Sequence, residues 1–143
     1  MRANIGVYRG KTYDNVWVEG NLIIENQIYH IYANGEKHKV IPESIGECTN
    51  LTDKNNKLIF EGDIVKFIHK GKLKSNEDFP FSVGEPYSRN YKIEYINTYT
   101  SYGLRFINGS IHFPCKQSTL LMYNCEIIGN IYDNPELLKG GTE

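Results

Sequence analysis

The feature that most constrains the fold is the regular alternation of strand-like segments with tight-turn residues. Within 27–33 the side chains alternate, so that Tyr29 and Ile31 lie on one face of an extended segment and their neighbours lie on the other. Asn34-Gly35 follows directly. Because a type I′ turn needs positive φ at both central positions, this dipeptide is a strong hairpin signal. The residues after it are therefore predicted to return as an antiparallel partner strand.

The same pattern recurs along the chain and predicts an all-β protein made of antiparallel hairpins. A second pair, Asn108-Gly109, joins two further alternating segments, and the first reversal of the chain fits either residues 20–21 or residues 25–26. The predicted strands are 15–19, 21–25, 27–33, 36–41, 58–60, 64–68, 91–95, 103–107, 110–113 and 125–132, and the predicted helices, both very short and near the C-terminus, are 117–122 and 134–138.

Charge and composition exclude several classes of protein. The formal net charge is −1, with 16 basic against 17 acidic residues, so the whole molecule has no field that attracts phosphate backbones or acidic membranes. The sequence has no apolar run of membrane length and its start lacks the apolar core of a signal peptide. Three cysteines are too few and too scattered for a disulfide framework. We therefore expect a cytoplasmic protein with no membrane partner.

Three blocks of sequence resemble the YopX family of phage and prophage proteins. The first lies within 8–20, the second is 49–65 with the sequence TNLTDKNNKLIFEGDIV, and the third is 126–138 with the sequence EIIGNIYDNPELL. The resemblance implies phage origin and a β-rich fold whose C-terminal part is an SH3-like small barrel. It implies no activity, because the family is known chiefly as proteins of unknown role.

Two positions depart from the family pattern, which usually has glycine where this chain has Asn50 and Asn56. Asparagine tolerates positive φ better than other residues with a side chain, so both turns are expected to survive. The motif residues to which we assign structural roles are Asp53, Glu61, Gly62, Asp63, Gly129, Asn130, Asn134 as a helix cap and Pro135 at the first helical position.

The expected organisation has two main parts. Residues 1–47 form an N-terminal hairpin region, and residues 48–138 form the YopX-like C-terminal barrel region. Within the second part, 69–90 is rich in Lys, Ser, Asn, Gly and Pro and is expected to be a loose insert. Residues 139–143 are expected to be a tail.

Glu61-Gly62-Asp63 is the strongest candidate for carboxylate chemistry, because paired carboxylates can act as acid and base. The sequence supplies no histidine or second acidic pair beside them. The favoured interpretation is structural: Gly62 adopts a backbone conformation that other residues cannot reach, and Asp63 caps nearby N–H groups. A carboxylate-based hydrolase is the least favoured function, and we expect no catalytic residues.

A metal site is also not expected. His112, Cys115 and Cys125 form a partial ligand set, but zinc needs four ligands and usually a close cysteine pair. Cys125 alternates with Ile127 and is expected to be a buried strand residue. No glycine-rich phosphate loop or dinucleotide fingerprint is present, so no cofactor is expected.

Basic and aromatic residues gather around the insert and are candidates for binding nucleic acid or a partner. Cations can track a phosphate backbone while aromatic rings stack on bases. Glu77, Asp78 and Glu85 dilute this set, and a solvated charged loop is the favoured alternative. The candidate residues are Lys66, Lys70, Lys72, Lys74, Arg89 and Tyr91.

The sequence therefore favours a non-enzymatic phage or prophage accessory protein that binds an unidentified host or phage macromolecule. A self-assembling β-module, and hence a homo-oligomer, is one alternative, because unpaired strand edges and Tyr side chains suit homotypic pairing. Binding of single-stranded nucleic acid through the basic–aromatic loop is another.

Overall fold

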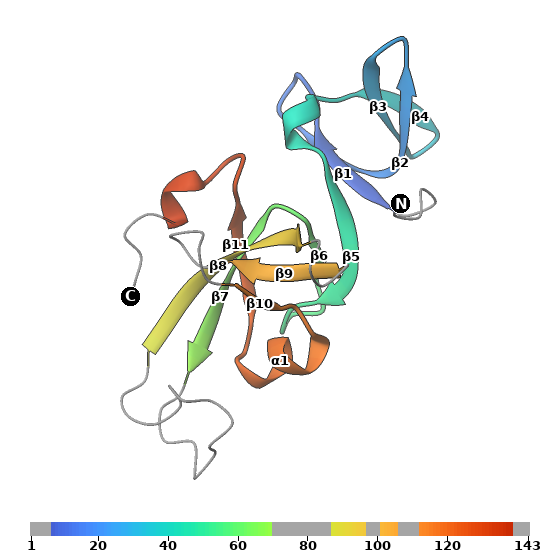
Figure 1. Ribbon diagram of the computed structural model, residues 1–143. Coiled ribbons are helices and arrows are strands. Elements are labelled where there is room, and N and C mark those ends of the chain that lie inside the picture. The colour runs from blue at the N-terminus through green and yellow to red at the C-terminus, as the bar shows by residue number, and fades with distance from the viewer. Residues whose placement is uncertain (1–6, 70–86, 97–100, 106–111, 139–143) are drawn as a thin grey trace. The chain divides into compact units, whose positions relative to one another are not determined.

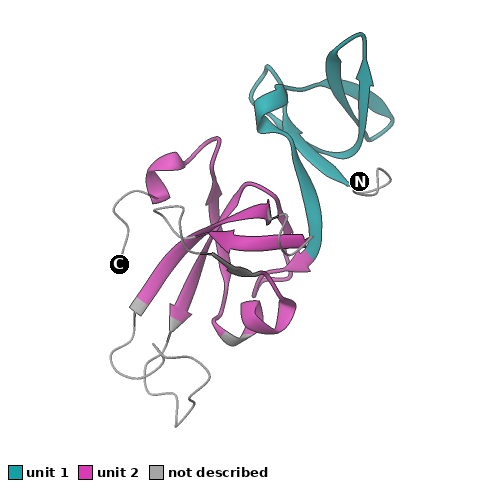
Figure 2. Ribbon diagram, in the orientation of Figure 1, with its two compact units in different colours: residues 1–50 teal, residues 51–143 magenta. Residues whose placement is uncertain are grey.

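The computed structural model describes residues 7–69, 87–96, 101–105 and 112–138 (Figure 1). The described chain is mostly β-strand with one short α-helix and short 3₁₀ turns, which confirms the predicted all-β class. Contacts divide the chain into two compact units, 1–50 and 51–143 (Figure 2). Each unit is described by itself below.

Unit 1 is an antiparallel sheet with the strand order β4-β3-β2-β1-β5. Strand β5 continues past the boundary and pairs with β6 of unit 2. The elements are β1 (Tyr8–Lys11), β2 (Trp17–Glu25), β3 (Ile28–Ala33), β4 (Glu36–Lys39), the 3₁₀ turn η1 (Pro42–Ser44) and β5 (Gly46–Thr52).

The predicted Asn-Gly hairpin is confirmed and joins β3 to β4. Asn34 and Gly35 have φ of 52° and 81°, as a type I′ turn requires. Strand β2 runs without a break, so the reversal expected at 20–21 or 25–26 occurs at Asn26-Gln27, both of which also have positive φ. An earlier reversal, which was not predicted, joins β1 to β2. The alternation in β3 is confirmed as well, because Ile31 is fully buried while Tyr32 on the opposite face is exposed.

Unit 2 contains an antiparallel five-stranded sheet with the order β10-β9-β8-β7-β11. Strands β7 to β10 follow one another, and β11 returns after a helical turn to pair with β7. Closure of this unit as an SH3-like barrel stays a prediction. The elements are β6 (Leu58–Phe60), β7 (Asp63–His69), β8 (Tyr87–Ile96), β9 (Ser101–Arg105), β10 (His112–Pro114), α1 (Gln117–Met122), β11 (Glu126–Asn130) and the 3₁₀ turn η3 (Pro135–Leu138).

Several predicted boundaries need correction. Strand β7 extends to His69 and β8 begins at Tyr87, so both ends of the expected insert 69–90 are strand, and 70–86 lie outside the described residues. Strand β11 stops at Asn130 instead of residue 132, because the Asn130 side chain starts a turn. The strands β1 and β5 were not predicted from the sequence. The hairpin of β9 and β10 is confirmed, and its Asn108-Gly109 turn lies outside the described residues.

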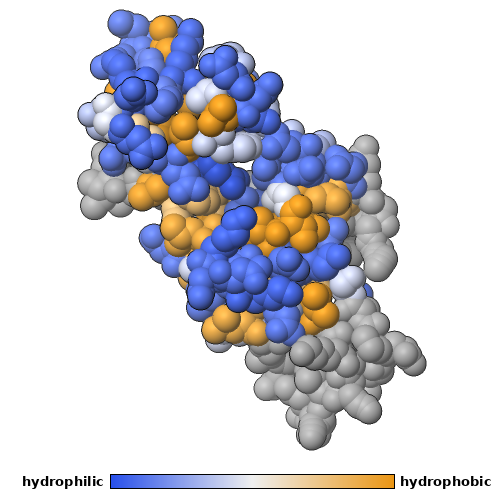
Figure 3. Space-filling view, turned by 180° about the vertical axis from the view of Figure 1, so that it is seen from behind, coloured by the Kyte–Doolittle hydropathy of each residue, from blue (hydrophilic) through white to orange (hydrophobic). Residues whose placement is uncertain are grey.

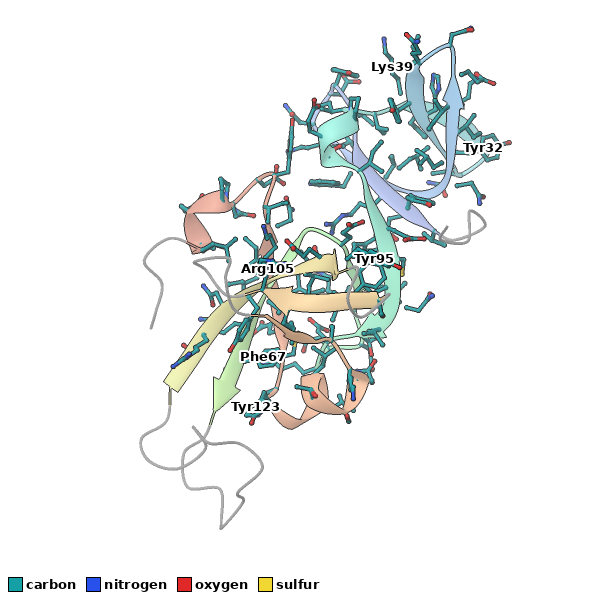
Figure 4. All side chains as sticks on the ribbon, viewed as in Figure 1. Tyr32, Lys39, Phe67, Tyr95, Arg105 and Tyr123 are labelled. Atoms are coloured by element: carbon teal, nitrogen blue, oxygen red, sulfur yellow. The ribbon has the colours of Figure 1, made fainter. Side chains whose placement is uncertain are left out.

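The core of unit 2 lies on one face of its sheet. Phe67 contacts Tyr91 edge-on, with ring centroids 5.0 Å apart, and stacks on Tyr123 at 5.5 Å. Phe67 and Tyr123 are labelled in Figure 4. Aromatic pairs at these separations add to the stability that comes from burial alone. The buried members of this cluster are Ile59, Val65, Phe67, Tyr91, Ile93, Leu104, Cys115, Leu120, Tyr123 and Cys125.

Candidate functional site

Asp53 is a buried carboxylate whose hydrogen bonds hold the turn between β5 and β6. Its Oδ1 atom accepts from the backbone N–H groups of Asn55 at 2.8 Å and Lys57 at 3.0 Å. Its Oδ2 atom accepts from the N–H of Ile127 in β11 at 3.1 Å. The side chain is 1% exposed, so it joins two segments that lie far apart in the sequence. Asn56, at the tip of this turn, has φ of 64°, the positive value expected for it.

The pKa of Asp53 lies below its usual value. Burial alone would raise this pKa, but the N–H donors of Ile127, Lys57 and Asn55, together with the positive charge of Lys57, outweigh it. The fold of unit 2 therefore stabilises the ionised form of Asp53, whose two oxygens serve as hydrogen-bond acceptors for the turn and for β11.

The free energy of unfolding of unit 2 should therefore fall in acid. Because the folded-state pKa of Asp53 is lowered, its contribution is complete above the unfolded pKa of about 4 and is lost as the pH falls through the folded-state value. Urea titrations between pH 7 and pH 3 measure this loss. Asp53→Asn should remove part of the pH dependence, and an unchanged acid limb in that variant would contradict the assignment.

Glu61-Gly62-Asp63 is a tight corner at the start of β7. Gly62 has φ of 95°, a value that L side chains rarely adopt, as expected for this position. Asp63 is 1% exposed and its Oδ2 atom accepts from the N–H of Phe60 at 2.8 Å. Asp63 thus caps a neighbouring N–H group in the manner expected from the sequence, and Glu61 remains half-buried.

The turn after β11 is fixed by two asparagine side chains. Oδ1 of Asn130 accepts from the N–H groups of Tyr132 at 3.0 Å and Asp133 at 2.8 Å, and Oδ1 of Asn134 accepts from the N–H of Asn130 at 3.2 Å. Asn134 therefore bonds back into the turn, and η3 begins at the next residue, Pro135. A Cβ atom at Gly129 would lie 2.6 Å from Oδ1 of Asn134, so a larger residue there would displace the Asn134 side chain.

These two motifs meet in unit 2. The N–H of Ile131 donates to the carbonyl of Gly62 at 2.8 Å, and Asn130 is the strand partner of Asp63. Ile131 and Tyr132 remain 42% and 39% exposed at the tip of this fixed turn. Neither of these two apolar side chains is among the site residues expected from the sequence. The sequence does contain a signal for them. Ile131 and Tyr132 are an apolar pair between the turn-forming residues Asn, Asp, Asn and Pro, and the turn itself does not require apolar side chains.

The proposed basic–aromatic set does not form one surface among the described residues. Tyr91 is 5% exposed and packs in the core, so little of its ring is accessible to a base. Arg89 pairs with Phe67 and shares the core-side face, while Lys66 pairs with Asn90 and lies on the opposite face. The remaining members, Lys70, Lys72 and Lys74, lie outside the described residues.

The cysteines are buried thiols. Burial raises the pKa of Cys115 to about 12 and raises that of Cys125 further above its usual value. Because the thiolate is the nucleophile and metal ligand, neither side chain is prepared for such chemistry at neutral pH. In the ranges that the structure describes, no three His, Cys, Asp or Glu side chains are grouped so as to hold a metal ion. In the same ranges, no helix has the length and apolar character needed to cross a membrane.

Comparison with known proteins identifies a family and a protein of similar structure. The family model described as "YopX protein" matches residues 8–139. No curated protein matches the sequence. A crystal structure of the protein EF1440 from Enterococcus faecalis is similar in fold, with a TM-score of 0.51 and 22% sequence identity over 94% of this chain and 97% of that one.

Proposed function

Because the chain belongs to the YopX family, whose function is unknown, we propose from its own geometry that it is a non-enzymatic phage or prophage accessory protein that binds a protein partner. The proposed contact surface is the turn that carries Ile131 and Tyr132, together with the corner at Gly62 on which Ile131 packs. We call this surface the apolar turn. Its partner is a host or phage protein.

The observation that carries the proposal is the exposure of two large apolar side chains on a turn whose backbone is held in place. Apolar residues scattered singly on a surface are ordinary, whereas Ile131 and Tyr132 are adjacent and share one tip. The hydrogen bonds of Asn130 and Asn134 fix that tip before any partner arrives. A preorganised surface loses less conformational freedom on binding, which favours affinity. Figure 3 shows how apolar residues lie in patches among hydrophilic ones on one face of the molecule.

Charge specifies the chemistry of the partner. Between residues 126 and 138 the sequence contains acidic residues and no Lys, Arg or His. Asp133 and Glu136 are exposed, and Glu61 is half-buried at the corner beside the turn. Complementary potentials steer association and select partners. The partner surface is therefore apolar at its centre and basic at its rim.

The carboxylates, in contrast, are engaged in structure. Asp53 and Asp63 are buried and accept hydrogen bonds from backbone N–H groups, which leaves them poorly placed to exchange protons with a substrate. This supports a binding role over hydrolysis.

The test is affinity capture from a lysate of the host bacterium with the full chain as bait. A protein enriched by the wild-type chain should be lost with the double variant Ile131→Ser/Tyr132→Ser. The matched control is Leu58→Ser/Leu121→Ser, which removes two other exposed apolar side chains, 44% and 57% exposed, from the same unit. Purified candidates are then titrated at two salt concentrations, because a basic partner should bind more weakly at high salt.

Two results would count against the apolar turn. In the first, both double variants lose the partner equally. In the second, the bait enriches only itself and light scattering shows concentration-dependent oligomers, which would favour the self-assembling β-module.

A further inference from the structure

Strand β1 of unit 1 presents alternate residues to the outside of its sheet. Gly10 and Thr12 are buried, and a Cβ atom at Gly10 would lie 3.0 Å from the side chain of Ile31 in the core. Arg9 and Lys11 therefore lie on the opposite side, because successive side chains of a strand alternate. Tyr13 belongs to the turn that follows β1.

Neighbouring strands add two more residues to this side. Trp17 of β2 is the strand partner of Lys11 and so shares its face. The antiparallel bridge between Thr12 and Val40 brings Tyr13 to Lys39 at the end of β4, which Figure 4 labels. We call the resulting surface the cation–aromatic face, and its members are Arg9, Lys11, Tyr13, Trp17 and Lys39.

The cations of this face lie against its rings. The Arg9 guanidinium carbon is 4.9 Å from the centroid of the Trp17 ring and the Lys11 ammonium is 5.7 Å from it. The Lys39 ammonium is 5.5 Å from the centroid of the Tyr13 ring. Cation–π pairs that matter energetically occur about once per 70–80 residues. Three such contacts within residues 7–50 exceed that frequency, so the cluster calls for a reason beyond chance.

A contribution to folding stability is a poor explanation for Tyr13, the most exposed residue of the face. An exposed cation–π pair contributes about 0.5–1 kcal/mol. Tyr13, 59% exposed, buries little of its ring against the protein, so the hydrophobic gain that usually justifies an aromatic residue is small. An exposed ring beside cations is instead the kind of surface on which single-stranded nucleic acids stack their bases while their phosphates contact the cations. Glu19 is the strand partner of Arg9 and so lies on the same face, and Asp14 follows Tyr13 in the chain; both carboxylates limit the net positive charge of the face.

We propose that the cation–aromatic face of unit 1 binds single-stranded nucleic acid, with Lys11 and Lys39 contacting phosphates and Tyr13 stacking on a base. This goes beyond the proposed protein contact, because it uses a different unit and a different class of partner. It is also distinct from the basic–aromatic set expected from the sequence, whose member Tyr91 is buried in β8 of unit 2.

The protein supplies its own reporter for the test. Trp17 is the only tryptophan of the chain and belongs to the proposed surface. Titration of the full chain with an unlabelled oligothymidylate of about 15 nucleotides should change Trp17 fluorescence, and the labelled oligonucleotide should gain anisotropy at the same concentrations. The logarithm of the affinity should fall linearly with the logarithm of the salt concentration.

Two sets of variants separate the electrostatic from the stacking contribution. Lys11→Gln/Lys39→Gln should reduce the steepness of the salt dependence by about 1.4, since each phosphate contact on a single strand contributes about 0.7. Tyr13→Ala should weaken binding roughly tenfold and leave the salt dependence unchanged, because stacking involves no counterion. The control Lys57→Gln/Lys116→Gln removes the same charge from exposed positions of unit 2 and should have neither effect.

A flat fluorescence titration at low salt overturns the proposal. So does an equal loss of salt dependence in the control pair, because binding would then be a property of net charge. Titration with a heparin fragment, which has anionic groups and no bases, tests whether Tyr13 contributes through base stacking. If Tyr13→Ala weakens heparin binding as much as oligonucleotide binding, the stacking role is wrong.

Discussion

Replacing Asp53 with alanine is expected to lower the free energy of unfolding of unit 2 by about 4 kcal/mol. The substitution leaves the N–H groups of Asn55, Lys57 and Ile127 without their acceptor. A buried donor that loses its partner costs about 1–3 kcal/mol. Because Ile127 lies in β11, the change also loosens the attachment of that strand to the β5–β6 turn.

Pulsed alkylation in increasing urea measures this effect in unit 2 alone. Cys115 and Cys125 are buried, so their thiols react only when the unit opens, and peptide mass spectrometry distinguishes them from Cys48. Asp14→Ala, at an exposed position of unit 1, is the control and should change stability by less than about 0.5 kcal/mol. If Asp53→Ala shifts the alkylation midpoint no further than this control, the carboxylate does not hold the turn.

Turn chemistry was the part of the fold that the sequence predicted best. Asn34-Gly35 forms the expected hairpin, and Asn50 and Asn56 have φ of 68° and 64° where the family pattern has glycine. These predictions succeeded because positive φ is a local property that few residue types tolerate. The same reasoning located Gly62.

Strands without apolar alternation were missed. Strand β1 contains Arg9, Gly10 and Lys11, which read as turn residues in sequence, yet Gly10 is buried because its missing side chain leaves room for Ile31. Strand β5 buries Glu47 and Thr49, which are polar residues. In both strands the packing of distant segments decides the conformation, and no window of local sequence contains that information.

The binding residues were harder to predict than the fold, because a strand period assigns faces only when the strand limits are known. Tyr91 looked like the edge of a loop, but β8 begins four residues earlier and places it opposite Val65 in the core. In the same way, Arg9 and Lys11 gain a common face only once β1 is recognised as a strand. When a strand is not recognised in the sequence, the side chains that share one of its faces cannot be predicted either.

Gly20 provides the severest test of the sheet in unit 1. Gly20 lies within β2, where a Cβ atom would overlap the backbone carbonyl oxygen of Tyr32 in the adjacent strand β3. A backbone atom cannot move aside as a side chain can, so Gly20→Ala must separate the two strands locally. Since β2 pairs with both β1 and β3, the expected loss is at least about 3 kcal/mol of the free energy of unfolding of unit 1.

Trp17 fluorescence in urea reports this loss selectively, because unit 2 contains no tryptophan. The matched control is Gly35→Ala in the hairpin of β3 and β4, where a Cβ atom meets nothing within 4 Å and only the positive φ of 81° opposes the change. That control should cost about 1–2 kcal/mol. Gly35 has the positive φ that disfavours a side chain, whereas Gly20 lies close to the backbone of β3. We expect the close approach to cost more, so Gly20→Ala should lower the free energy of unfolding more than Gly35→Ala. Equal losses would mean that β2 and β3 can separate at Gly20 without disturbing the rest of the sheet.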